Sequence, residues 1–147
     1  MTTIQEWTRG EYVISTDPQR LDADVIQGFL ARSYWAQHRS RERMARAIEH
    51  SIPFGLYQGR KQIGFARVVT DYATMAWLAD VFVDETYRGH GLGVWLVDTA
   101  TNLPELLEVR RFIPSTRDAH ELYRKMGFTE PIPNRLMERF NADSDRL

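Results

Sequence analysis

The most constraining feature of this chain is the segment formed by residues 81–96. It begins as an apolar strand pattern, after which Gly89, Gly91 and Gly93 mark a short turn that leads directly into an amphipathic helix pattern. The first N–H groups of a helix have no intrahelical partner and lie at the positive end of the helix dipole. Because glycine has no Cβ, it permits a tight turn and lets an anion approach those N–H groups. The segment therefore predicts a strand–turn–helix unit that binds phosphate.

The spacing of these glycines separates the turn from two common phosphate-binding loops. It does not read G-x-G-x-x-G, as in dinucleotide-binding folds, and it lacks the lysine of the G-x-x-x-x-G-K-[ST] loop of nucleoside triphosphatases. It reads instead Arg88-x-x-Gly91-x-Gly93. On these residues alone, a phosphate site and a tight connection without a ligand are both open interpretations.

A second pattern narrows the interpretation. Residues 116–128 have the pattern of a helix that ends in Tyr-x-Lys-x-Gly-Phe at residues 123–128. Together with the R-x-x-G-x-G turn, this segment resembles the GNAT superfamily of acetyl-CoA-dependent N-acetyltransferases, and the resemblance covers about residues 12–140. It implies an α/β fold with a central mixed, mostly antiparallel twisted sheet of about six to seven strands, flanked by about four helices.

The size and charge of the chain agree with one small enzyme domain. A chain of 147 residues supports a single core, so we expect one domain over residues 1–147 with its core at about 12–140. The net charge of −1 gives no general attraction to nucleic acid or to an anionic membrane. The absence of cysteine excludes disulfides and a thiolate nucleophile, and without a secretion-signal pattern a cytoplasmic location is expected.

The four histidines have no metal-ligand spacing, so we expect no metal cofactor.

The hydrophobic periodicity gives a coarse order of elements. Strands are expected at residues 11–15, 53–57, 62–69, 75–83, 106–113 and 135–140. Helices are expected at residues 22–35, after the N-cap candidate Ser40, after the glycine turn, and around Tyr123.

The resemblance assigns residues to the cofactor, acetyl-CoA. The strand before the turn would pair with the pantetheine arm through its main chain, because an extended amide chain can act as another strand. The residues implied to bind the cofactor are Phe82, Val83, Arg88, Gly89, His90, Gly91, Leu92, Gly93, Thr116 and Tyr123. Thr116 replaces an asparagine common in the family, so Ser115 and Thr116 are alternatively interpreted as N-caps of the following helix.

Acetyl transfer needs a proton donor for the departing thiolate, and Tyr123 is the candidate general acid. It matches the tyrosine to which the family assigns this role. The alternative is a core tyrosine, because Ala119, Leu122, Tyr123 and Met126 fall on one helical stripe.

The general base is harder to assign. The strand positions where many family members carry a base are here Trp77 and Ala79, which cannot take a proton. Asp80 has the required chemistry but the opposite strand parity, so it would face the cleft only if a β-bulge turned it. Asp71, beside the preceding turn, is the second candidate. The alternatives are an ion-paired carboxylate at Asp80 and a solvated turn carboxylate at Asp71. A weak base favours an acceptor amine of low pKa.

Tyr34 and Trp35 either wall an acceptor pocket or cap the core, and Trp77 is a third candidate for acceptor binding. The basic run from Arg39 to Arg46 is either a solvated helix face or a site for an acceptor carboxylate.

The resulting hypothesis is acetyl transfer to a primary amine of a small molecule or peptide, by direct attack in a ternary complex. We expect a monomer or homodimer without nucleic-acid or membrane partners. The alternatives are a catalytically silent acyl-CoA-binding module that acts as a sensor or mediates an interaction, and a module that binds nucleic acid or protein through the basic helix.

Overall fold

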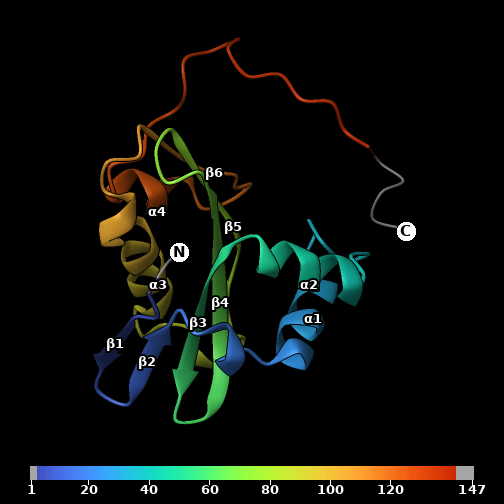
Figure 1. Ribbon diagram of the computed structural model, residues 1–147, viewed down its shortest axis with the longest axis vertical. Coiled ribbons are helices and arrows are strands. Elements are labelled where there is room, and N and C mark those ends of the chain that lie inside the picture. Colours follow the sequence, from blue (N-terminus) through green and yellow to red (C-terminus); the bar gives the residue numbers. More distant parts are fainter. Residues whose placement is uncertain (1–2, 142–147) are drawn as a thin grey trace.

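The computed structural model describes residues 3–141, and its centre is one six-stranded sheet whose strands lie in sequence order (Figure 1). Neighbouring strands are antiparallel except for the last pair, β5 and β6, which is parallel. The strands are β1 (Glu6–Arg9), β2 (Tyr12–Ser15), β3 (Ile52–Gln58), β4 (Lys61–Thr70), β5 (Met75–Val83) and β6 (Arg111–Pro114). The expected mixed, mostly antiparallel sheet is therefore confirmed.

Helices cover both faces of this sheet. On one side lie α1 (Ala23–Ala31) and α2 (Arg41–Glu49), and on the other lie α3 (Leu92–Thr101) and α4 (His120–Lys125) (Figure 1). Three short 3-10 helices, η1 (Pro18–Arg20), η2 (Glu85–Tyr87) and η3 (Pro104–Leu106), lie in the connections. Within residues 3–141, no helix is long and apolar enough to cross a membrane.

Two apolar clusters attach these helices to the sheet. The larger joins α3 and Tyr123 to one face, and the smaller joins α1 and α2 to the other. In the smaller cluster, the ring of Phe29 stacks on Phe82 with 3.9 Å between centroids. Both faces are thus filled, which explains the uninterrupted buried run at residues 62–66 in β4.

Several predicted elements are confirmed. The strand expected at 11–15 is β2, and the three long strands match β3, β4 and β5. Ser40 is the N-cap of α2, since its hydroxyl oxygen accepts a hydrogen bond from the N–H of Arg43 at 3.1 Å. β1, which pairs with β2 at the sheet edge, was missed.

Two predicted elements are shorter than expected. The helix expected at 22–35 ends at Ala31, because the hydroxyl of Ser33 donates to the carbonyl of Leu30 and accepts from the N–H of Ala36. The strand expected at 106–113 is reduced to β6, since η3 takes up residues 104–106 and buries Leu106.

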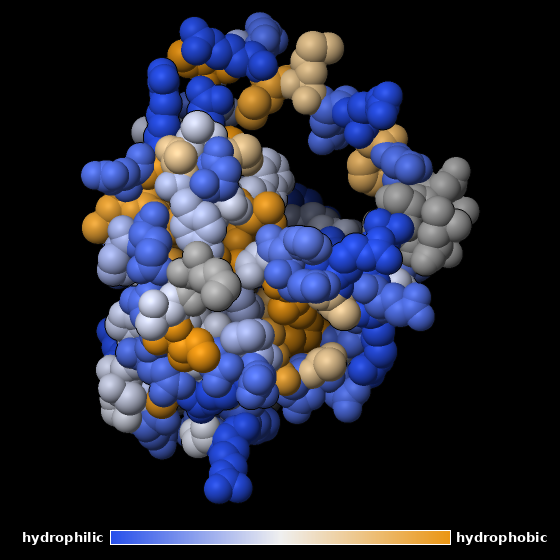
Figure 2. All heavy atoms as spheres, in the orientation of Figure 1, coloured by the Kyte–Doolittle hydropathy of each residue, from blue (hydrophilic) through white to orange (hydrophobic). Residues whose placement is uncertain are grey.

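The strand expected at 135–140 is wrong, because no regular element forms after α4 within the described chain. Residues 129–131 and Leu136 instead line a groove beside β6, and the segment as a whole arches over the body (Figures 1 and 2).

Candidate active site

The site is built where β5 and β6 separate. The two strands pair only from Met75 and Arg111 to Leu78 and Pro114, although β5 continues to Val83. Proline has no N–H to donate, so Pro114 is a natural end for the ladder. Residues 79–83 therefore have no strand partner on this side among the residues described, and the gap between the strands opens at this point.

The glycine-rich turn follows at the end of β5. Gly89 has φ of +87° and Gly91, the N-cap of α3, has φ of +71°. These left-handed conformations are accessible to glycine at little cost, which explains both residues. No side chain caps α3, so its first N–H groups are available to an anion, as the sequence predicts.

Gly93 has a different explanation from its two neighbours. A Cβ placed on it would meet only a methyl group of Val83, at 3.9 Å, which is an ordinary van der Waals contact. The protein's own packing therefore does not require glycine here.

A cleft of about 770 Å³ lies between the separated strands and the end of α1. It brings together nine of the predicted site residues. These are Tyr34, Trp35, Trp77, Phe82, Val83, Arg88, Gly93, Thr116 and Tyr123. Gly89, His90 and Gly91 are exposed beside it, and the Leu92 side chain is buried in the core, so Leu92 can offer a ligand only its backbone. The structure thus brings nine of the predicted residues to the lining of one cavity and leaves Gly89, His90, Gly91 and Leu92 outside it.

Tyr123 is packed in the core and also reaches the cleft, so its position is compatible with either interpretation. It lies on α4 with 8% of its surface exposed, and its ring packs edge-on against Phe128 at 5.5 Å. It also lines the cleft. Burial raises the pKa of its phenol, and the nearby Tyr34 raises it further. A phenol in this position stays protonated at neutral pH, as a proton donor must.

A β-bulge in β5 determines which face of the sheet Asp80 occupies, as the sequence predicts. The pairing of β4 with β5 shifts register between Phe65 and Arg67, and Asp80 has φ of +54°. The bulge places Asp80 toward α1 and α2, on the same face as Trp77 and Phe82. Asp80 is nevertheless not among the residues that line the cleft.

The chemistry of Asp80 is that of an ion-paired carboxylate. It is 5% exposed and accepts hydrogen bonds from Arg67 Nε at 2.6 Å, Arg39 at 2.7 Å and Trp35 Nε1 at 2.8 Å. Burial alone would raise the pKa of Asp80, but the guanidinium groups of Arg67 and Arg39 outweigh it, so the pKa lies below its ordinary value. Asp80 is therefore a weak proton acceptor. Its charged partner Arg67 was not predicted from the sequence.

Asp71 is equally unsuited to take a proton. Its carboxylate accepts hydrogen bonds from the Thr74 hydroxyl and from the N–H groups of Ala73, Thr74 and Met75. These hydrogen bonds lower the pKa of Asp71, with the Thr74 hydroxyl as the largest cause. Asp71 stabilises the exposed turn between β4 and β5.

The connection between α1 and α2 forms one wall of the cleft. Trp35 is fixed by Asp80, and the ring of Tyr34 lies edge-on to it at 5.1 Å. The Arg117 guanidinium lies 3.7 Å from the centre of the Tyr34 ring, and the Arg117 N–H donates to the Tyr34 hydroxyl at 3.2 Å. These contacts join the connection to the segment after β6 across the cleft.

Two arginines of the basic run from Arg39 to Arg46, at the start of α2 and just before it, form ion pairs. Arg39 pairs with Asp80, and Arg41 pairs with Asp24.

The N-cap prediction for Ser115 and Thr116 is wrong in position, since the N-cap of α4 is Ala119. Thr116 instead accepts a hydrogen bond from the N–H of Ala119, one turn earlier.

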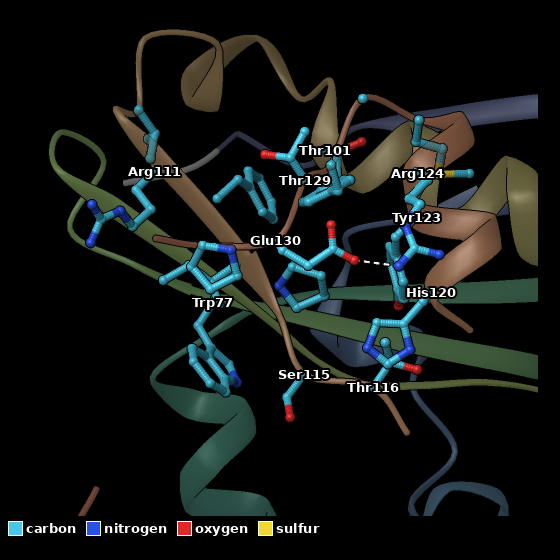
Figure 3. A pocket seen from close by; sticks show the side chains of 18 of the residues that line it. Trp77, Thr101, Arg111, Ser115, Thr116, His120, Tyr123, Arg124, Thr129 and Glu130 are labelled. Carbon is cyan, nitrogen blue, oxygen red and sulfur yellow. Dashed lines mark hydrogen bonds and ion pairs between the residues drawn. The ribbon is translucent and has the colours of Figure 1, made fainter. Parts of the chain in front are cut away.

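A second cavity, the edge groove, runs along the outer side of β6 and has a volume of about 760 Å³ (Figure 3). Figure 3 shows Trp77 at one end of it, and His120 and Tyr123 on the opposite side. The edge groove shares four lining residues with the cleft, namely Trp77, Ser115, Thr116 and Tyr123. The two cavities are therefore adjacent.

Comparison with known proteins agrees with this geometry. Residues 49–130 match the sequence model of the acetyltransferase (GNAT) domain. A provisionally named acetyltransferase of Gibberella zeae is 32% identical, and the match covers 85% of this chain and 82% of that protein. The chain belongs to the GNAT acetyltransferase family.

Solved structures of this family share the fold. A provisionally assigned GNAT acetyltransferase from Xanthomonas campestris pv. campestris superposes with a TM-score of 0.87 at 40% identity, covering 92% of this chain and 97% of its own. A provisionally assigned acetyltransferase from Clostridium acetobutylicum, whose structure contains acetyl-CoA, superposes with a TM-score of 0.64 at 13% identity, and the match covers 88% of this chain and 94% of that one.

Proposed function

We propose that this GNAT protein transfers an acetyl group from acetyl-CoA to a primary amine of a small molecule or peptide. The observation that carries the proposal is that β5 residues 79–83, which have no strand partner on the side of β6 in the described chain, lead into the uncapped start of α3 in one cleft. An extended amide chain can pair with such a strand, and a pyrophosphate can accept hydrogen bonds from such a helix start. The acetyl-CoA bound to the Clostridium acetobutylicum relative supports this cofactor.

The proposed reaction is direct attack within a ternary complex. The neutral amine attacks the thioester carbonyl carbon, and the nitrogen of the resulting intermediate loses a proton to solvent. The C–S bond then breaks, the thiolate takes a proton from Tyr123, and the Tyr123 phenolate regains a proton from solvent. The raised pKa of the Tyr123 phenol keeps that proton available at neutral pH. The chain contains no cysteine to carry an acyl group, which also favours the direct route.

The state of Asp80 bears on the acceptor. Its carboxylate is held by two guanidinium groups, so we assign it the role of anchoring the acceptor wall and not of removing the amine proton. At pH 7.4 an α-amine of pKa about 8 is roughly one-fifth neutral, whereas deprotonating a lysine-type amine costs about 4 kcal/mol. We therefore propose an acceptor amine of low pKa.

A test is the release of free CoA thiol from acetyl-CoA over a panel of primary amines. Because the chain has no cysteine, a thiol reagent reports only the CoA product. We expect amine-dependent release, faster with α-amines than with alkylamines of high pKa. The alternative, a silent acyl-CoA-binding module, predicts that CoA binds in a calorimetric titration while no amine in the panel accelerates thiol release.

A further inference from the structure

One arginine that lines the cleft, Arg117, has no ion-pair partner among residues 3–141. Arg39 lines the same cleft, but its guanidinium is held by the buried carboxylate of Asp80. A guanidinium is always protonated in proteins, so an arginine at the wall of a cavity attracts an anion unless a carboxylate of the protein already neutralises it. Arg117 is therefore the arginine of the acceptor wall that is available to a ligand.

The guanidinium of Arg117 is nevertheless held in one place. It lies 3.7 Å from the centre of the Tyr34 ring, and the backbone N–H of Arg117 donates a hydrogen bond to the Tyr34 hydroxyl at 3.2 Å. A guanidinium stacked on a ring uses its face and keeps the N–H donors along its edge. That edge matches a carboxylate, which can accept two parallel hydrogen bonds from it. Arg117 is thus arranged to bind a planar anion with little further loss of side-chain entropy.

Arg117 lies at the end of the cleft that is remote from the glycine turn. Leu78 of β5 pairs with Pro114 of β6, so the segment that follows β6 starts beside the middle of β5. The glycine turn instead follows Val83, the last residue of β5. The start of α3, where the pyrophosphate is proposed to bind, and Arg117 therefore belong to different ends of the cleft.

The electrostatics around Tyr34 agree with this placement. Burial raises the pKa of the Tyr123 phenol, and the nearby Tyr34 raises it further. Tyr34 is therefore within electrostatic reach of the residue that is proposed to protonate the thiolate. Because Arg117 is stacked on Tyr34, its guanidinium borders the proposed site of acetyl transfer.

Two further arginines of the cleft lie toward the glycine turn. Arg88 belongs to the turn itself, as the C-cap of η2. Hydrogen bonds from Thr86 lower the pKa of Asp84, the residue after β5, and the guanidinium of Arg32 contributes to the lowering, so Arg32 lies near the end of β5. These two arginines are placed for the phosphates of a cofactor, which leaves Arg117 to the acceptor end.

We propose that Arg117 binds a carboxylate of the acceptor, so that the acceptor is an amine that also carries a carboxylate group, as an amino acid does. This inference rests on the proposed function, because it names the class of amine that receives the acetyl group. A carboxylate held by Arg117 confines the amine of the same molecule to the region of the thioester, which favours direct attack. The charge of the cleft agrees, since its lining contains four arginines and two carboxylates, namely Arg32, Arg39, Arg88, Arg117, Glu85 and Asp118.

The test compares an amino acid with its carboxamide as acceptors, by the release of CoA thiol. The wild type should use the amino acid with a kcat/KM that is higher by about tenfold or more. The amine pKa cannot cause this preference, because a neighbouring carboxylate raises the pKa of an amine and so reduces its neutral fraction. In Arg117→Gln, kcat/KM should fall by about tenfold or more for the amino acid and by less for the carboxamide, so that their ratio approaches one or falls below it.

Two further variants control the comparison. Arg117→Lys keeps the charge but not the planar fork, so it should keep part of the preference. Arg46→Gln removes an exposed arginine of the basic run that lines neither cavity, and it should keep the wild-type ratio. The Arg117 side chain is exposed, and both Arg117 variants retain the backbone N–H that donates to Tyr34, so circular dichroism of these variants should match the wild type.

Four results would overturn the inference. Amine-dependent thiol release with no preference for the amino acid would overturn it and leave the proposed function standing. Loss of the preference in Arg46→Gln would assign the acceptor carboxylate to α2. If Arg117→Gln weakened the binding of CoA but not of dephospho-CoA, which lacks the phosphate on the ribose, Arg117 would serve the cofactor. No thiol release with any amine would overturn the proposed function and this inference together.

Discussion

The two halves of β5 build the cleft in different ways. The half that ends in the glycine turn offers main-chain groups, and the residues that matter most there are glycines with positive φ. The other half offers side chains, with Trp77 in the cleft and Asp80 tied to Trp35 and Arg39. A site made of main chain leaves a local sequence pattern, whereas a site made of side chains is assembled from segments far apart in the chain.

This difference predicts opposite responses to mutation. Substitutions in the glycine turn should reduce cofactor binding. They should lower the stability of the fold only by the local backbone strain that they introduce. Changes around Asp80 should reduce stability, because they leave buried charges without partners.

The largest effect is expected for Asp80→Asn. Asparagine tolerates the left-handed conformation of this position, so the substitution isolates the loss of charge. Removing one partner of a buried ion pair costs about 3–5 kcal/mol, because the side chains of Arg67 and Arg39 stay largely buried. Urea unfolding should show this loss.

The matched control is Asp24→Asn, which breaks the exposed ion pair with Arg41 and should change stability little. If Asp80→Asn were as stable as the wild type but inactive, Asp80 would be the general base after all.

The next largest effect is expected for Gly91→Val. A branched side chain strains the turn at φ of +71° and obstructs an anion at the start of α3. Loss of two charge-assisted hydrogen bonds, each worth about 1.5–3 kcal/mol, should weaken CoA binding at least a hundredfold in a calorimetric titration.

Gly10→Val controls for backbone strain, since Gly10 has φ of +59° in the turn between β1 and β2. It should lose stability and keep its CoA affinity. Equal CoA affinity in the wild type and a folded Gly91→Val protein would show that the turn is only a connection.

A smaller effect is expected for Tyr123→Phe, which deletes the hydroxyl and keeps the ring packing against Phe128. General acid catalysis is typically worth about 10²- to 10⁴-fold, and solvent can replace part of it, so kcat should fall at least tenfold. CoA affinity and the thermal midpoint should change little. Wild-type turnover would assign Tyr123 to the core alone, and the thiolate would then be protonated by solvent.

The smallest expected effect is the loss, at acid pH, of the stability that the Asp80 ion pairs contribute. Because the folded state lowers the pKa of Asp80 below its ordinary 3.8, the ionised carboxylate stabilises the fold above that pH. This contribution is lost as the pH falls through the lowered value of the folded state. The stability difference between wild type and Asp80→Asn should therefore be constant near neutral pH and shrink below about pH 4. A difference that persists undiminished in strong acid would contradict the ion-pair explanation.

The main-chain half of the site could be predicted from the sequence because its pattern is contiguous. The strand, the glycines and the helix start lie within residues 81–96, and the structure places them as expected. Tyr123 was also found, because its helix carries a second local pattern.

The side-chain half could be predicted only in part. The predicted orientation of Asp80 depended on a bulge. That bulge arises from the pairing of β4 with β5 and leaves no signature in the sequence of β5 alone. Its partner Arg67 lies in a strand that otherwise reads as apolar, and nothing local connects the two residues. The strand expected at 135–140 does not form, since alternation of side chains along a segment does not by itself supply a neighbouring strand for it to pair with.

The bulge at Asp80 adds one residue to β5 relative to the paired stretch of β4. Trp77 and Phe82 share a face although they are five positions apart, an odd separation that a regular strand would place on opposite faces. Deleting the extra residue would leave Trp77 and Phe82 four positions apart, which a regular strand places on one face, so Phe82 would keep its side of the sheet and its contact with Phe29. What such a deletion would remove is the local turn that directs the Asp80 carboxylate to Arg67 and Arg39, so the extra residue serves the buried ion pairs and not the packing of the end of β5.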